Sequence, residues 1–87
     1  MEITSVSVQK VNDGNRLRGY ASVKIDDCFA IKGMRIIDGN NGLHIAMPNR
    51  RKSDGKFVDI VNPTTQECRD KFTKAILDEY NKILDEE

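Results

Sequence analysis

The hydrophobic pattern of this chain changes its period once, near residue 64. Before that point apolar and polar residues alternate, most clearly from Leu17 to Ile25, where every second residue is small or apolar. After it, apolar residues recur every three or four positions from Cys68 to Leu84. A period of two predicts strands with one buried face, and a period near 3.6 predicts an amphipathic helix. We therefore expect an α+β fold with antiparallel strands followed by one C-terminal helix.

Five runs of β-forming residues precede the helix, and turn-forming stretches rich in Asn, Asp and Gly separate them. The third run changes its apolar parity across Gly33, which predicts a bulge or bend there. Consecutive runs are expected to pair as a meander of about five strands, with a loop at 48–56 before the last one. The runs cover residues 2–11, 17–25, 28–37, 43–47 and 57–61.

The helix is expected to begin at Thr64-Thr65-Gln66-Glu67 and to run to about residue 84. This sequence fits a capping box, with a hydroxyl at the N-cap and a carboxylate three residues later. One helix covers only one face of a small sheet, and a meander leaves two edges unpaired. A chain of 87 residues is also close to the size at which a single core is marginal. The prediction is a single domain, 1–87, that forms a homodimer.

The overall charge argues against a grossly basic protein, because 14 basic and 14 acidic side chains give a formal net charge of zero. The charge is unevenly distributed. Residues 1–63 hold ten basic and seven acidic side chains, net +3, whereas 64–87 hold four and seven, net −3. Local charge therefore matters more than the total.

Catalysis and metal binding find little support in the sequence. His44 is the only histidine, and neither it nor Cys28 and Cys68 shows the spacing of paired metal ligands. The two cysteines are expected to be reduced and buried. No apolar run approaches the ~20 residues of a membrane span, and the N-terminal run leaves no room for a signal peptide. A cytoplasmic protein without catalysis, cofactor, membrane or small-molecule substrate is expected.

The segment 37–52 is the most informative for function. Asn-Gly pairs in the turn Asp38–Gly42 are expected to supply the positive φ angles of a tight hairpin, which would deliver the cations behind it to one place. Within 48–56 only Asp54 opposes four cations. Such side chains on a turn contact phosphates, although a solvated tip that maintains solubility is the alternative. The four cations are Arg50, Arg51, Lys52 and Lys56.

Four further cations lie on the predicted helix. Each of the three lysines follows an acid by four residues, which favours intrahelical pairs and a solvated face. These pairs are Glu67 with Lys71, Asp70 with Lys74 and Asp78 with Lys82. Arg69 lies nearer the apolar stripe and lacks such an acid, so it is kept as a candidate nucleic-acid contact.

The polar parity of the second run is a third candidate. Arg18, Tyr20, Ser22 and Lys24 place cations beside an aromatic ring, an arrangement that can stack single-stranded bases. A subunit contact through Tyr20 is the favoured interpretation, because one aromatic residue alone defines little.

With these residues in place, the chain resembles the stage V sporulation protein G (SpoVG) family over nearly its whole length. The resemblance is carried by MEITSVSVQKV, IKGMRIIDGNNGLHIAMPNRRK, DGKFVDIVNP and ILDEYNKIL. Two positions depart from the family pattern, His44 where Phe is usual and Asn49 where Ser is usual. The resemblance implies a dimeric α/β domain of bacterial cytoplasm that binds nucleic acid and regulates gene expression, with roles in septation and sporulation. It also implies that Arg50 and Arg51 take part in binding.

The sequence thus predicts a homodimer that binds DNA, with RNA as a further ligand. The expected contacts are Arg50, Arg51, Lys52 and Lys56, assisted by Arg69 from the helix. The alternative is a protein-interaction module that uses a strand edge or a sheet face, in which the cations serve solubility alone.

Overall fold

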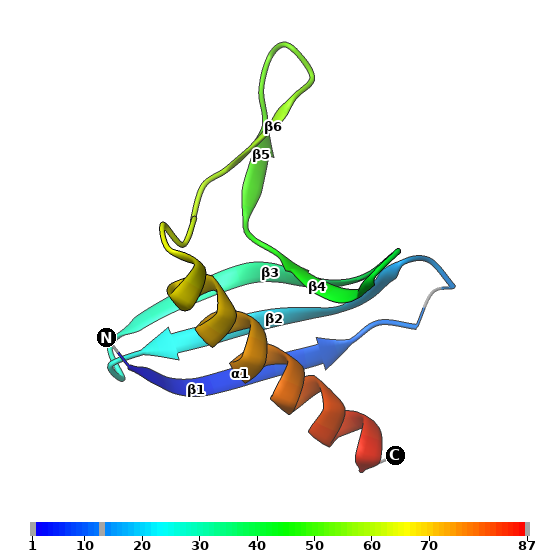
Figure 1. Cartoon of the computed structure of the whole chain (residues 1–87), viewed down its shortest axis with the longest axis vertical. Helices are drawn as coiled ribbons and strands as arrows, with labels where there is room; N and C mark the ends of the chain where they lie inside the picture. Colours follow the sequence, from blue (N-terminus) through cyan, green and yellow to red (C-terminus); the bar gives the residue numbers. More distant parts are fainter. Residues whose placement is uncertain (1, 13, 87) are drawn as a thin grey trace.

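The main sheet has four antiparallel strands in the order β1-β2-β3-β4 (Figure 1). The computed structural model describes residues 2–12 and 14–86. The expected α+β class is confirmed, as is the meander of the first four strands. These strands are β1 Ile3–Lys10, β2 Leu17–Ile25, β3 Phe29–Gly39 and β4 Gly42–Ala46.

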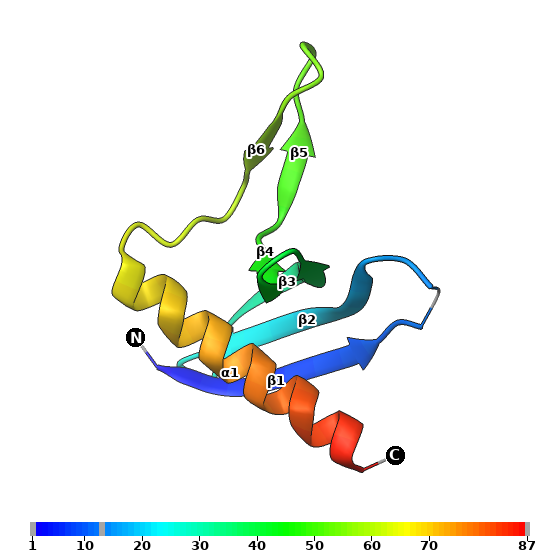
Figure 2. The same cartoon turned by 45° about the vertical axis from the view of Figure 1, so that its right-hand side comes forward.

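The helix α1, Gln66–Asp85, crosses one face of this sheet over β1 and β2 (Figures 1 and 2). It buries Phe72, Ile76 and Tyr80 against the sheet, because these side chains recur at i+4 on one side of the helix. The apolar parity predicted for β2 faces this core. The sheet and the chain that follows it contribute Ala21, Val23, Ile25, Met34, Ile36, Ile45 and Met47.

The N-terminus of α1 is capped one residue later than predicted. The Thr65 hydroxyl accepts a hydrogen bond from the Cys68 amide at 3.1 Å, so Thr65 is the N-cap. The residue three positions after it is a cysteine, and the predicted capping box between Thr64 and Glu67 is therefore wrong. With two adjacent threonines, the sequence could not tell which hydroxyl would reach the orphan amides.

The predicted bulge at Gly33 is confirmed. The pairing of β2 with β3 shifts between Ala21, opposite Met34, and Val23, opposite Ile31. Two residues of β3, Lys32 and Gly33, therefore face a single residue of β2. Gly33 has a φ of +86°, which a residue without Cβ adopts readily.

The turns lie where the sequence places them, with some differences in detail. The turn between β3 and β4 closes over Asn40-Asn41, and its positive φ is at Gly42 rather than at an asparagine. The turn between β2 and β3 is formed by Asp26 and Asp27, which both have positive φ. The first predicted turn includes residue 13, which is outside the described residues.

The expected fifth strand of the meander is wrong, because residues 57–59 pair elsewhere. β5, Asn49–Arg51, and β6, Phe57–Asp59, form a separate two-stranded antiparallel sheet. A third of the predicted loop 48–56 is thus the first strand of a hairpin. Pro48 precedes it and has no amide hydrogen to donate to a ladder, so the chain leaves the main sheet at this point.

Both cysteines are free, but the expectation that they are buried is wrong. Cys28 is exposed beside the β2–β3 turn, and Cys68 is half-buried on the first turn of α1. Within the described residues, α1 has too much charge along its length to cross a bilayer, and no other helix is present that could.

Candidate nucleic-acid interface

The hairpin of β5 and β6, here called the hairpin arm (residues 49–59), projects away from the main sheet and the helix (Figures 1 and 2). Its tip is a tight turn over Ser53-Asp54-Gly55. The Lys52 amide donates to the Lys56 carbonyl at 2.7 Å, and the Gly55 amide donates to the Lys52 carbonyl at 3.0 Å. Gly55 has a φ of +87°, which explains the glycine at this position. The arm is thus an ordered two-stranded ribbon.

The cations of the arm share one region of the molecule but not one face. Arg50 is paired with Val58 and Arg51 with Phe57 across the ribbon. Because successive side chains of a strand point to opposite sides, Arg50 and Arg51 lie on opposite faces of the arm. The hairpin predicted around Asp38–Gly42 is that of β3 and β4, so it does not itself present the cations: they lie on the arm, a second hairpin, and Arg50 and Arg51 point in opposite directions.

The arm is not internally neutralised. Arg50, Arg51, Lys52 and Lys56 are all exposed, and none has an ion pair with a carboxylate of the described residues. The acid nearest to them in sequence, Asp54, accepts a hydrogen bond from the Lys56 backbone amide at 2.9 Å. Its carboxylate therefore stabilises the turn. The resulting surface carries unpaired positive charge suited to an anionic ligand.

Arg69 is placed on a different element from the arm. It lies on the first turns of α1, half-buried, and its guanidinium donates to the Asn62 side-chain oxygen at 3.2 Å. Asn62 belongs to the segment that joins β6 to α1. Arg69 thus holds this connection, and its role in nucleic-acid binding stays a prediction.

The helix acids pair differently from the prediction. The Lys74 ammonium contacts the Asp78 carboxylate at 2.7 Å, whereas Asp70 accepts a hydrogen bond from the Gln66 amide group at 2.7 Å. Asp78 therefore serves Lys74 rather than Lys82. The hydrogen bond that the Lys74 ammonium donates to Asp78, together with the negative charge of Asp78, raises the pKa of Lys74 above its ordinary value of 10.5. The helix therefore has a solvated, partly paired face, as predicted, although the individual partners differ.

The polar side of β2 faces away from the helix. Arg18 forms an ion pair with Asp38 at 3.0 Å, so that cation is matched within the chain. Tyr20 and Lys24 are exposed, and Ser22 lies half-buried between them. His44 is exposed on β4, opposite Ile37.

Apolar side chains on the arm were not predicted as part of any site. On the arm, Phe57 is 67% exposed and Val58 is also exposed, and Ile60, the residue after the arm, is 63% exposed. The sequence predicts the run FVDIV only as the fifth strand of the meander and assigns no site to it. Only the turn-forming residues Ser53–Gly55, between two short runs, could have suggested that these apolar residues lie on a projecting hairpin.

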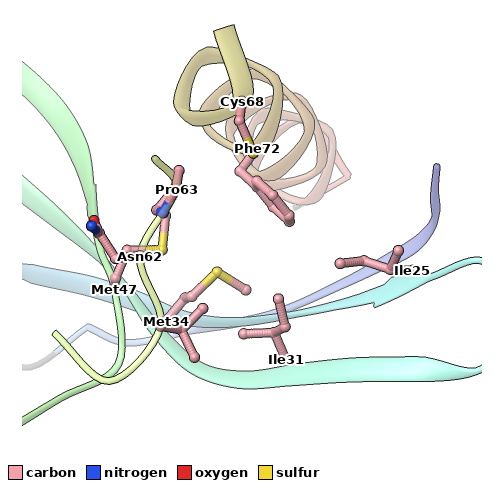
Figure 3. Close-up of a pocket in the computed structure, with 9 residues that line it drawn as sticks. Ile25, Ile31, Met34, Met47, Asn62, Pro63, Cys68 and Phe72 are labelled. Carbon is pink, nitrogen blue, oxygen red and sulfur yellow. The ribbon is translucent and has the colours of Figure 1, made fainter. Parts of the chain in front are cut away.

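An apolar cavity of about 180 Å³ lies between the start of α1 and the sheet (Figure 3). Cys68 and Phe72 of the helix face the sheet residues across it, and the segment that follows the arm borders it. The lining is almost entirely apolar, which is unsuited to an ionic ligand. Its residues are Ile25, Ile31, Met34, Met47, Val61, Asn62, Pro63, Cys68 and Phe72.

Comparison with known proteins gives a family. The model of the SpoVG family matches residues 1–82. The chain belongs to the SpoVG family. It is similar to the SpoVG protein of Treponema denticola, with 51% identity over 94% of this chain and 88% of the relative. The SpoVG protein of Bacillus subtilis is 44% identical over 100% of this chain and 90% of the relative. That of Caldicellulosiruptor saccharolyticus is 39% identical over 97% of this chain and 96% of the relative. The resemblance on which the sequence analysis relied is thereby confirmed.

Proposed function

We propose that this protein is a non-catalytic, homodimeric regulator that binds nucleic acid, DNA and also RNA, through the cations of the hairpin arm. The observation that carries the proposal is the charge of the arm. Its four exposed cations have no carboxylate partner among the described residues, and Asp54 is engaged by the backbone of the turn. When unpaired Arg and Lys side chains neutralise phosphates, counterions are released from the nucleic acid, and this release favours binding.

The shape of the arm supports a duplex as the ligand. A two-stranded β-ribbon is narrow enough to enter the major groove of B-DNA. Arg50 and Arg51 point to opposite faces of the ribbon, as their pairing with Val58 and Phe57 requires. A ribbon in a groove would therefore present one arginine to each of the two phosphate backbones that border it.

A homodimer is supported by the apolar surface that one chain leaves uncovered. Ile60, in the segment that follows the arm, is 63% exposed. β1 and β4 are the edges of the main sheet and have one free side each. Association of two copies would cover such groups and would place two arms on one nucleic acid.

A cellular role in septation comes from the relatives, whose names link them to that process. Control of gene expression during septation or sporulation is the process we propose for this chain. The competing function is a protein-interaction module, which the exposed apolar residues of the arm would also serve.

The test is a salt titration of binding to labelled duplex DNA, after light scattering has established the mass of the protein. With about three to six phosphates contacted per dimer, the binding constant should fall by about one and a half to three orders of magnitude between about 50 and 200 mM salt. The double variant Arg50→Ala/Arg51→Ala should bind all sequences more weakly, with a shallower salt dependence. Lys74→Ala is the matched control, because it also removes an exposed cation, but one that is paired with Asp78.

An unchanged affinity and salt slope in the double variant would show that the arm is not the binding element. Absence of binding by the wild type at about 50 mM salt would favour the interaction module, since the electrostatic contribution is largest at low salt.

A further inference from the structure

The face of the main sheet opposite α1 is polar, whereas the face under α1 is apolar. On β2, Tyr20, Ser22 and Lys24 alternate with the core residues Ala21 and Val23. Their neighbours across the ladders share this side, because residues opposite one another in register point the same way. We call this surface the open face. Its polar members include Ser7, Gln9, Tyr20, Ser22, Lys24, Lys32 and Arg35, and Ala30 and Ala46 share it.

The open face contains a hollow of about 180 Å³ beside the bulge in β3. The bulge sets Lys32 and Gly33 opposite Ser22, and Gly33 has no side chain to fill the space. A Cβ at Gly33 would meet nothing within 4 Å, which shows that the space above it is open. The hollow has a mixed lining of polar side chains, one aromatic ring and small residues, from Ser7, Gln9, Tyr20, Ala21, Ser22, Lys32 and Gly33.

The charge of the open face is positive and unmatched. Lys24, Lys32 and Arg35 form no ion pair with the described residues. The nearest matched cation, Arg18, is held by Asp38. Asp26, in the turn that follows β2, accepts a hydrogen bond from the Glu2 backbone amide at 2.9 Å. Lys32 thus lines the hollow, and Lys24 and Arg35 lie on the same face of the sheet, with no carboxylate of the described residues paired to any of the three.

These groups match the parts of a nucleotide one by one. The Tyr20 ring, 45% exposed, offers a surface on which a base can stack. Hydroxyl and amide groups of Ser7, Ser22 and Gln9 can donate to and accept from the edge of a base. Cations at the rim can contact the flanking phosphates. A base within a duplex is stacked and paired, and a broad sheet cannot enter a groove, so the ligand must expose its bases.

We propose that the open face binds single-stranded nucleic acid. One base stacks on Tyr20 and occupies the hollow beside Gly33, while Lys24, Lys32 and Arg35 contact the phosphates. This site is separate in the fold from the hairpin arm and stands on its own observations, although both surfaces take the same chemical class of ligand. The protein then reads duplex and single strands with different elements.

The test compares short labelled oligouridine, oligothymidine and a mixed-sequence duplex by fluorescence anisotropy. Tyr20→Ala should weaken single-strand binding by about fivefold to about 150-fold, the range observed for the loss of one base–aromatic stack. Tyr20→Phe keeps the ring and should stay within about twofold of the wild type. Lys32→Glu should lower the salt slope for single strands by about one or more.

The proposal is overturned if the wild type retains neither oligonucleotide at low salt. It is equally overturned if Tyr20→Ala and Lys32→Glu both bind single strands as the wild type does. Lys74→Ala controls for the loss of a surface charge, because Lys74 lies on α1, across the sheet from this face, and its ammonium is paired with Asp78. A variant pair Arg50→Ala/Arg51→Ala without effect on duplex binding would refute the function of the arm and leave this site standing. If the double variant weakens duplex binding while Tyr20→Ala and Lys32→Glu leave single-strand binding unchanged, this site alone is refuted.

Discussion

The opposite orientation of Arg50 and Arg51 predicts how the hairpin arm meets a duplex. If the arm enters a groove, each arginine faces a different phosphate backbone, and each single substitution to alanine removes one contact per arm. Each phosphate contact contributes about 0.9 to the slope of log K against log salt for B-DNA. With two arms engaged in a dimer, Arg50→Ala and Arg51→Ala should each lower the slope by about 1.8, and the double variant by about 3.6.

The assay is a series of anisotropy titrations at four or more salt concentrations for the wild type and the three variants. Comparison of slopes is more informative than comparison of affinities, because the slope counts phosphates and is insensitive to the fraction of active protein. Folding should be unaffected, since both side chains are exposed and neither contacts the core. Lys74→Ala should leave the slope unchanged because its partner Asp78 already compensates that cation.

An unequal result would refute the groove geometry. If one arginine accounts for the whole change in slope, the arm lies flat on the nucleic acid and only one of its faces is in contact. If neither substitution changes the slope, the exposed charge of the arm has no part in binding.

Two predictions concern the helix. Thr65→Ala should lower the stability of the protein by about 0.5–2 kcal/mol, because the Cys68 amide loses its acceptor, and Thr64→Ala, one residue outside the cap, should have much less effect in denaturant unfolding. The Lys74–Asp78 pair stabilises the folded state below pH 10.5, where Lys74 is protonated in both states, and this contribution is lost as the pH rises through the raised pKa. Asp78→Asn should remove that alkaline decline in melting temperature, and the decline itself should be small and salt-sensitive because the pair is exposed.

Burial determined which parts of the fold could be predicted. The alternation in β2 and the i+4 apolar series in α1 place their side chains in one core, so both elements have a strong sequence signal. The bulge at Gly33 was also predictable, because a bulge in a half-buried strand must change the parity of its apolar residues.

The hairpin arm lacks that signal. β5 consists of Asn49, Arg50 and Arg51, none of which is apolar, and its pairing with β6 rests on backbone hydrogen bonds and a turn. Phe57 and Val58 of β6 are apolar but exposed, and the β-forming composition of residues 57–61 favoured a fifth strand of the meander. Only the turn chemistry at Ser53–Gly55, between two short runs of equal length, could have indicated a separate hairpin.

The sequence could predict which residues make up the candidate site but not the directions in which their side chains point. Four cations opposed by one acid can be counted in a sequence, and the structure leaves them unpaired within its described residues. Whether Arg50 and Arg51 point together or apart depends on whether the backbone is a loop or a strand. The hollow on the open face was beyond sequence reasoning, because it arises where the bulge of β3 meets Ser22 of β2.

A chain with no net charge can bind a polyanion if its charges are segregated by the fold. Residues 64–87 carry four basic and seven acidic side chains, net −3, and most of them lie on α1, which covers one face of the sheet. The open face and the arm lie outside that layer and carry the unmatched cations (Figures 1 and 2). At physiological ionic strength charges are screened over about 8 Å, so phosphates in contact with the cations are only weakly repelled by carboxylates across the sheet. Added salt reduces the distant repulsion before the close attraction, and the local surface charge therefore decides binding.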